Sequence, residues 1–316
     1  MIEQNYRKSN LIVTKITEFW EIKLLTMLSK NNKWLLLVVL SLIWGSSFIL
    51  IKRGLVGLNP FQLGALRIIF ATLFLLIVGF KSLFRIPLYK WKYIALTSLF
   101  GTGLPVFLFA YAQTGIKSSV SGILNSLTPL YTLLLGMLAF GLMFQRNQII
   151  GVLLGLSGCL MLVIGGNSGN GQTDYFYAFL VVIATLCYAL NVNLIKKYLS
   201  DVSPLSITTG NFTVLLLPAL AILFATGYPQ IASNPDVVHA TLFIIILGIL
   251  GTGVANIIYF QLIQITSPLF ASSVTYFIPL VAMAWGLLDG EMLTSLQFLG
   301  SLIILSGVYI ASKNRA

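Results

Sequence analysis

Long apolar segments follow one another from Trp34 to the end of the chain, separated by short breaks that contain Gly, Pro, Asn or charged residues. A helix of about 20 apolar residues crosses a lipid bilayer. Hydrophobic residues make up 58% of the chain and charged residues only 9%, whereas ordinary soluble domains are about 25% charged. The segments therefore predict an all-α, polytopic membrane protein with ten transmembrane helices. Their approximate ranges are 34–52, 60–80, 91–112, 119–140, 147–165, 176–195, 204–226, 239–262, 269–289 and 295–312.

The basic residues are distributed unequally between the two sides of the predicted bundle. With the N-terminus in the cytoplasm, fifteen of the 19 Lys and Arg residues fall in cytoplasmic segments, and only Lys52, Arg53 and Lys117 fall in outer ones. Cytoplasmic loops of membrane proteins carry such an excess. The pattern predicts a multi-pass protein of the cell (inner) membrane with both termini, including a tail at 1–33, in the cytoplasm. It also accounts for the net charge of +11 without a nucleic-acid partner.

Several short motifs occur twice, about 150 residues apart. The pairs are Gly101-Thr102-Gly103 with Gly251-Thr252-Gly253, Pro129-Leu130 with Pro279-Leu280, and Leu156-Ser157-Gly158 with Leu305-Ser306-Gly307. We interpret residues 34–165 and 176–312 as two repeats of five helices. Because five is odd, the second repeat enters the membrane from the opposite side, an arrangement typical of secondary transporters that work by alternating access. The alternative is a duplication that serves stability alone.

The repeated motifs are accompanied by others that together resemble a known family. They are Ile43-Trp44-Gly45-Ser46-Ser47-Phe48 followed by Lys52, Asn59-Pro60, Ala65-Leu66-Arg67, Asn125-Ser126-Leu127-Thr128-Pro129-Leu130, and Gly290-Glu291. The chain is similar over about 34–312 to an EamA-type permease of the drug/metabolite transporter superfamily. The resemblance implies ten helices in two EamA repeats, which export or exchange amino acids, metabolites or drugs through a central cavity. One departure is that Phe144-Gln145-Arg146 stands in the first half where the second has Gly290-Glu291.

Arg67 is the one charged residue well inside a predicted span. It lies seven residues after Pro60, roughly 10 Å along a helix axis. An ionisable residue within the membrane suggests a functional site, and here the guanidinium would attract a substrate carboxylate. The alternative is an arginine that extends to the outer interface or serves assembly. No Asp or Glu lies within a span, which favours a facilitator or exchanger over a proton antiporter.

Polar and aromatic residues within the spans are the candidates for substrate binding, because small-molecule sites combine apolar walls with a few polar groups. The candidates are Trp44, Ser47, Arg67, Tyr111, Gln113, Asn125, Thr128, Tyr188, Asn191, Asn256, Tyr259 and Tyr276. For each of them the alternative is a hydrogen bond between helices or a place in the interfacial aromatic belt. The candidates for gating hinges, or alternatively for close helix packing, are Gly101, Gly103, Pro129, Gly251, Gly253 and Pro279.

The chain lacks the residues that most enzymes of membranes would need. It has one histidine, His239, and two cysteines within apolar segments, Cys159 and Cys187, so no catalytic triad, metal or other cofactor is expected. The glycine-rich stretch 165–171 lacks the following Lys and Ser or Thr of a phosphate-binding loop. We therefore expect a secondary transporter of small organic solutes, most plausibly amino acids or related metabolites. The alternatives are efflux of drugs or cationic compounds, and a non-transporting membrane partner or receptor subunit.

The surroundings of such a transporter follow from the same features. Its partners are expected to be the small-molecule substrate and the lipid bilayer. Gly151-xxx-Gly155 has the small-residue spacing of close helix–helix contacts. This spacing fits packing within the chain or a homodimer.

Overall fold

The computed structural model describes residues 32–116, 118–143, 145–166, 175–288 and 294–312, and within these residues all regular structure is helical. Six helices are long and apolar enough to cross a membrane, so the protein is a multi-pass membrane protein. They are Lys33–Gly54 (α3), Pro60–Leu83 (α4), Leu88–Ala112, Tyr175–Tyr198 (α10), Pro204–Ala225 (α11) and Pro235–Ile265. Shorter apolar helices make up the rest of the bundle.

Two of the six long helices contain one turn of π-helix. The helix 88–112 consists of η3 (Leu88–Lys90), α5 (Trp91–Ser98), the π-turn η4 (Leu99–Gly103) and α6 (Leu104–Ala112). The helix 235–265 consists of α13 (Pro235–Gly248), the π-turn η5 (Ile249–Val254) and α14 (Ala255–Ile265). Each π-turn contains one copy of the repeated Gly-Thr-Gly motif. Single π-turns within α-helices occur frequently at functional sites.

Two predicted spans prove to be broken helices. The prediction of a continuous helix over 119–140 is wrong. α7 (Ser118–Asn125) ends at Asn125, and a second helix, α8 (Thr128–Phe140), begins at Thr128 with Pro129 in its first turn. The segment 269–289 is likewise divided into α15 (Pro268–Ser272) and α16 (Val274–Leu288). Proline suits the first turn of a helix, where its missing N–H is not needed. Pro129 thus begins a helix, whereas Pro279 lies inside α16 as expected.

Polar residues followed by proline begin several of the helices. Asn59 accepts a hydrogen bond from the backbone N–H of Gln62, whose side chain accepts one from the N–H of Asn59, a complete capping box. The hydroxyls of Ser203 and Ser267 accept from the backbone N–H of Ser206 and Phe270 and so cap α11 and α15, each directly before a proline. These caps place the start of each helix at a defined residue.

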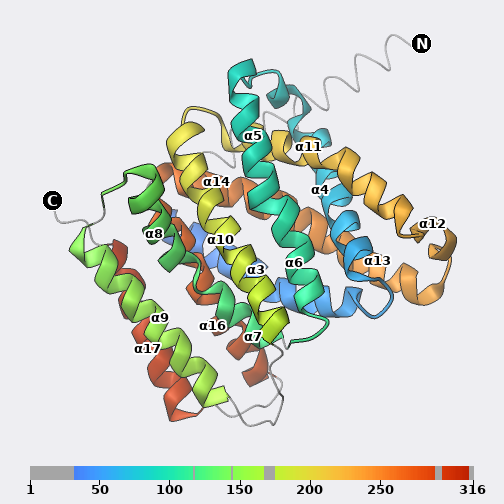
Figure 1. The fold of residues 1–316 in the computed structure, drawn as a ribbon. Coiled ribbons are helices and arrows are strands. Elements are labelled where there is room, and N and C mark those ends of the chain that lie inside the picture. The colour runs from blue at the N-terminus through green and yellow to red at the C-terminus, as the bar shows by residue number, and fades with distance from the viewer. Residues whose placement is uncertain (1–31, 117, 144, 167–174, 289–293, 313–316) are drawn as a thin grey trace.

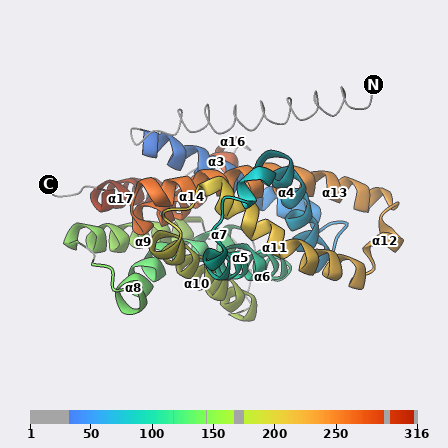
Figure 2. The same cartoon turned by 90° about the horizontal axis from the view of Figure 1, so that it is seen from above.

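The two halves of the chain are interleaved in space (Figure 1). α3 packs against α13, α14 and α16 of the second half, and α10 packs against α5 to α8 of the first half. We call α3, α4 and α13 to α17 the first layer, and α5 to α11 the second layer; Figure 2 shows them stacked. The layers meet where α4 lies along α11 and where α9 (Arg146–Gly166) lies along α17 (Ser295–Ser312).

Glycines allow α9 and α17 to approach closely. A Cβ on Gly151 would lie 2.5 Å from the carbonyl oxygen of Gly307, and one on Gly158 would lie 2.6 Å from that of Gly300. A Cβ on Gly155 would lie 2.6 Å from the ring of Tyr276. Gly151 and Gly155 therefore contact other helices of their own chain, which is the packing alternative for this motif.

Lysines join the helix ends on one side of the bundle, which we call the basic end. Lys90 Nζ lies 2.8 Å from Asp201 Oδ1 and also donates to the carbonyl of Tyr198. The hydrogen bond from Lys90 lowers the pKa of the exposed Asp201 carboxyl below its ordinary value. Lys197 donates to the carbonyl of Phe140. All of these residues belong to the second layer, so the contacts stabilise that layer at its basic end.

Candidate functional site

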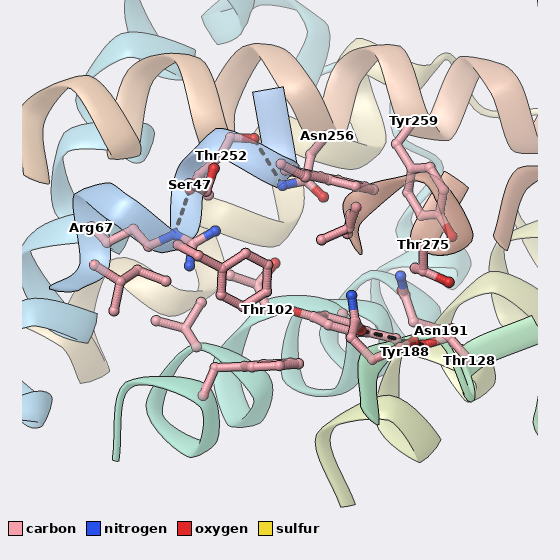
Figure 3. Close-up of a pocket in the computed structure, with 18 residues that line it drawn as sticks. Ser47, Arg67, Thr102, Thr128, Tyr188, Asn191, Thr252, Asn256, Tyr259 and Thr275 are labelled. Carbon is pink, nitrogen blue, oxygen red and sulfur yellow. Dashed lines mark hydrogen bonds between the residues drawn. The ribbon is translucent and has the colours of Figure 1, made fainter. Parts of the chain in front are cut away.

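A cavity of about 90 Å³ lies between the two layers. The first layer contributes residues of α3, α4, η5, α14 and α16, and the second layer contributes residues of η4, α6, α7, α8 and α10. Figure 3 shows the polar side chains around the cavity, with Arg67 at one end and Tyr188, Asn191 and Thr128 at the other. The cavity therefore lies at the junction of the two repeats, and its wall moves if the layers move.

Arg67 supplies positive charge to the cavity from α4. Its Nε donates a hydrogen bond of 2.6 Å to Thr252 Oγ1 in η5, and Thr252 Oγ1 in turn donates to the carbonyl of Leu247. That carbonyl lies five residues before Thr252, so the hydroxyl bonds back along its own helix. Because Nε is engaged, the guanidinium is held in one orientation, and its two terminal nitrogens, which bond no other described residue, remain for a ligand. A guanidinium of this kind suits a carboxylate, which accepts two parallel hydrogen bonds.

Aromatic rings form much of the remaining wall. Trp44 donates from Nε1 to the carbonyl of Gly251 at 3.0 Å and meets Tyr259 edge to face, with ring centroids 4.9 Å apart. On the facing layer, Phe109 stacks on Tyr188 at 5.8 Å. The hydrogen bond fixes the Trp44 ring against the π-turn. The rings provide rigid apolar surface for the uncharged part of a solute.

Amide and hydroxyl groups lie at the end of the cavity away from Arg67 (Figure 3). Asn191 is 2% exposed, and its Oδ1 has no hydrogen-bond partner among the described residues. Thr128 donates to the carbonyl of Asn125 at 2.7 Å. An unpaired buried oxygen is costly unless a ligand or water satisfies it. Asn191 is therefore suited to accept a hydrogen bond from a solute's ammonium, amide or hydroxyl group.

The described wall of the cavity carries one charge, the positive charge of Arg67. Of the residues that line the cavity in the described part of the chain, Arg67 is the one charged side chain, and none is Asp or Glu. Within the same residues, no group of three or more His, Cys, Asp or Glu side chains is placed to hold a metal ion. Asp289 and Glu291 lie outside the described residues. The electrostatics of this wall favour an anionic group and oppose a cation.

Nine of the twelve residues predicted to bind substrate line this one cavity. They are Trp44, Ser47, Arg67, Asn125, Thr128, Tyr188, Asn191, Asn256 and Tyr259. Tyr111 and Gln113 lie instead at the end of α6, where Tyr111 is 38% exposed and stacks near Tyr177. The hydroxyl of Tyr276 donates to the carbonyl of Val152, so this side chain packs between α16 and α9. The structure brings the nine together, and their binding of a substrate stays a prediction.

The four glycines predicted as hinges all lie in the two π-turns. Gly101 leaves room for Asn191, because a Cβ at position 101 would lie 2.6 Å from the Asn191 side chain. A Cβ on Gly251 would lie 3.0 Å from Ser47 Oγ. A Cβ on Gly253 would lie 2.9 Å from Phe74. The glycines therefore allow close packing at a point where the α-helical ladder is interrupted. Their role as hinges stays a prediction.

Sequence reasoning missed eight of the lining residues. They are Phe48, Ile51, Thr102, Val106, Phe109, Thr252, Thr275 and Ile278. Thr102 and Thr252 carried a usable signal, because each lies between the two glycines of the repeated motif. The apolar members have no such signal, since a Phe or Ile that faces a cavity cannot be distinguished by sequence from one that faces lipid or another helix.

One family of known proteins matches both halves of the chain. The model of the EamA-like transporter family matches residues 32–164 and, a second time, residues 175–313. The chain belongs to the EamA-like transporter family. The two matches together cover most of the chain and coincide with the two interleaved halves.

Curated transporters resemble the chain over most of its length. A probable amino-acid metabolite efflux pump of Salmonella typhimurium is 27% identical over 297 residues, which cover 90% of this chain and 95% of the relative. The pump of the same description from Escherichia coli is 26% identical, with the same coverage. An uncharacterised inner membrane transporter of Escherichia coli, YedA, is 27% identical over 88% of this chain and 90% of its own.

One solved structure has a similar fold. It superposes with a TM-score of 0.67, covers 90% of this chain and 97% of its own, and shares 18% sequence identity. At this identity the likeness concerns the fold alone.

Proposed function

We propose that this EamA-like transporter exports or exchanges small amino-acid-like metabolites that carry a carboxylate. The single observation that carries the proposal is the Arg67 guanidinium, held by Thr252 in a cavity whose described wall has no opposing acid. A solute carboxylate would bind the free nitrogens of Arg67, and its apolar part would lie against Trp44 and Tyr259. The printed description of two relatives as probable amino-acid metabolite efflux pumps supports the same class.

The size of the cavity supports a small solute. Its volume of about 90 Å³ is well below the roughly 300–1,000 Å³ of pockets that enclose drug-sized ligands. A cavity of this size is better suited to small amino acids and related metabolites. Polycyclic drugs are larger, and a cationic drug would also be repelled by Arg67. We therefore rank efflux of cationic drugs below metabolite export.

We also propose that the chain crosses the membrane ten times and that it acts as a transporter and not as an enzyme. The six long helices would supply six crossings, and α7 with α8, α9, α15 with α16, and α17 would supply four. The second repeat would then be inverted relative to the first, and the basic end would face the cytoplasm together with both termini. The layers would rock about the cavity so that it opens alternately to each side. A role as a non-transporting subunit has no specific observation in its favour.

Transport itself is tested with the purified chain in liposomes. Vesicles preloaded with an unlabelled amino acid should accumulate the same labelled amino acid by counterflow, at rates above protein-free vesicles. A panel of small neutral amino acids, their decarboxylated amines and a cationic dye would separate the two transport classes. Counterflow of the amino acids without the amines is expected. Efflux of the dye alone would contradict the proposal and favour the drug-transport alternative.

The side chain that orients Arg67 should affect affinity for the solute. Thr252→Val removes the oxygen that accepts from Arg67 Nε while it keeps the shape of the side chain. We expect the half-saturating solute concentration in counterflow to rise roughly tenfold, the effect of losing one hydrogen bond to a charged group. Thr102→Val is the matched control, because Thr102 lines the cavity from the corresponding position in η4. If both variants raise the half-saturating concentration equally, Thr252 contributes only to the shape of the cavity wall and not to the orientation of Arg67.

The proposed topology is tested with reporters fused to the chain. A fluorescent protein after Ala316 should fold and fluoresce in the cytoplasm, and alkaline phosphatase inserted between α11 and α12 (Tyr228–Ile231) should be active outside it. The expectation rests on the excess of basic residues on one side of the bundle. A phosphatase that is active at the C-terminus would place that end outside the cytoplasm and contradict the proposed orientation.

A further inference from the structure

The two repeats place a lysine at corresponding helix ends. Leu50-Ile51-Lys52 near the end of α3 matches Leu194-Ile195-Lys196 near the end of α10 at an offset of 144 residues. Asn59-Pro60 and Ser203-Pro204, which begin the next helices, match at the same offset. Lys52 and Lys196 are therefore equivalent positions. They lie at opposite ends of the bundle, since Lys196 belongs to the basic end and Lys52 precedes the loop between α3 and α4.

Lys196 binds the last carbonyls of α14 in the other layer. Its Nζ donates to the carbonyls of Ile263 at 3.1 Å, Gln264 at 3.0 Å and Thr266 at 2.6 Å. The last carbonyls of a helix have no partner within the helix and carry partial negative charge. The ammonium therefore satisfies the C-terminus of α14 with all three of its protons.

Gln264 makes the reverse contact. Its Nε2 donates to the carbonyls of Leu199 at 3.2 Å and Val202 at 2.7 Å, which follow the end of α10. α10 and α14 thus cap each other, and we call the contacts of Lys196 and Gln264 the crossed cap. Residues 191–195 of α10, on the cavity side of the crossed cap, are all buried. The crossed cap therefore joins the two layers where α10 and α14 leave the cavity toward the basic end.

The equivalent contact is open at the opposite end. Lys52 is exposed, and the described residues offer it no hydrogen bond or ion pair. Ile49 on α3 is 48% exposed, whereas its equivalent on α10, Asn193, is fully buried. The equivalent of the α14 terminus is the end of α6, where the carbonyls of Gln113, Thr114 and Ile116 correspond to those that Lys196 binds, at the 150-residue offset of the Gly-Thr-Gly motifs. The two ends of the bundle are thus in different states although their sequences correspond.

The α4–α11 pair, by contrast, has an equivalent hydrogen bond between the layers at each of its two ends. At one end of the α4–α11 pair, Gln62 Nε2 donates to the carbonyl of Thr226 at 2.9 Å. At the other end, Ser206 Oγ donates to the carbonyl of Ser82 at 2.9 Å. This pair is held at both of its ends, as expected for a pivot. The difference between the two ends of the bundle is therefore specific to the α3–α6 and α10–α14 contacts.

We propose that the crossed cap is the cytoplasmic gate, shown here closed, and that Lys52 closes the outer gate in the opposite state by binding the carbonyls at the end of α6. This inference rests on the proposed alternating-access function, and it identifies Lys196, Gln264 and Lys52 as the residues that set the balance between the two states. Breaking a contact made in one state shifts the population toward the other by as much as that contact contributes.

The gate is tested by hydrogen exchange of the full chain in lipid nanodiscs without solute. Lys196→Met keeps the apolar stem and removes the three donors. We expect roughly tenfold faster amide exchange at 192–199 and 258–266, and slower exchange at the opposite end, 49–56 and 109–116. Lys197→Met is the control, because Lys197 also donates to a helix-terminal carbonyl, that of Phe140, but within its own layer. Lys196→Arg keeps donors for the carbonyls and should resemble the unmodified protein.

The opposite shifts at the two ends distinguish a gate from local loosening. Gln264→Leu removes the other half of the crossed cap and should give the same pattern, which keeps the test informative if Lys196→Met does not fold. Lys52→Met should leave exchange at the basic end unchanged or slower, and it should slow counterflow. Faster exchange at both ends, or no difference from Lys197→Met, would overturn the gate. Since exchange needs no solute, absence of counterflow together with the expected exchange pattern would reject the proposed function alone.

Discussion

Arg67→Met is expected to reduce solute counterflow by about 100-fold at low solute concentration while the protein still inserts and folds. A charged group that binds a carboxylate in a partly buried site contributes roughly 2–5 kcal/mol when its partner is left unpaired, and 2.7 kcal/mol is a factor of about 100. Arg67 is the one charged side chain on the described cavity wall, so no neighbour can replace it. The measurement is initial counterflow rate against solute concentration, with gel filtration to verify folding.

Arg67→Lys is the matched control for the charge. Lysine keeps the positive charge but lacks the planar pair of donors and the Nε that binds Thr252. We expect a partial loss, between the unmodified protein and Arg67→Met. If Arg67→Met transports normally, Arg67 serves assembly or extends to the interface, and the carboxylate assignment fails.

Gly158→Leu should destabilise the whole protein without touching the cavity. The new side chain would begin 2.6 Å from the carbonyl oxygen of Gly300 and 2.9 Å from the backbone N of Ile304, so the backbone of α17 would have to move. Overpacking of this kind costs about 3 kcal/mol, and the α9–α17 contact that it disrupts joins the two layers. Thermal unfolding in detergent should show a midpoint lower by several degrees, or the variant should fail to accumulate as a monodisperse protein.

Ser157→Leu is the control on the same helix. Ser157 is the neighbour of Gly158, but its side chain is exposed and bonds only within α9. An added leucine there would face lipid, so the unfolding midpoint should stay unchanged. If both variants unfold at the same temperature as the original chain, the close approach of α9 and α17 does not limit stability.

The sequence predicts the helical membrane class well, because the length of an apolar segment depends directly on bilayer thickness. It also predicts much of the cavity wall, since polar side chains within a span must find a partner, a cavity or water. Trp44, Asn191 and Asn256 follow this rule. Tyr111 and Tyr276 do not, because aromatic hydroxyls serve equally well at interfaces and in hydrogen bonds between helices.

The breaks within the spans could not be predicted from hydrophobicity. The segment from Ser118 to Phe140 has the length and mean hydropathy of one span, so hydropathy alone predicts a single helix, although Asn125 and Pro129 stand where the helix stops and resumes. Polar backbone exposed by such a break is tolerated in a membrane only where protein or a cavity surrounds it. The interleaving of the two halves could not be predicted either, because it depends on contacts between residues more than 100 positions apart, such as Gln62 with Thr226.

The single positive charge of Arg67 on the described cavity wall has a consequence for how voltage would act on the proposed solute. A solute that carries net charge through the cavity crosses the electrical potential of the membrane. That potential is worth about 2.3 kcal/mol per elementary charge for each 100 mV, equivalent to a concentration ratio of roughly 50. In a cell that is negative inside, a monoanion bound to Arg67 would be driven outward by voltage, whereas a zwitterion would move only down its own gradient.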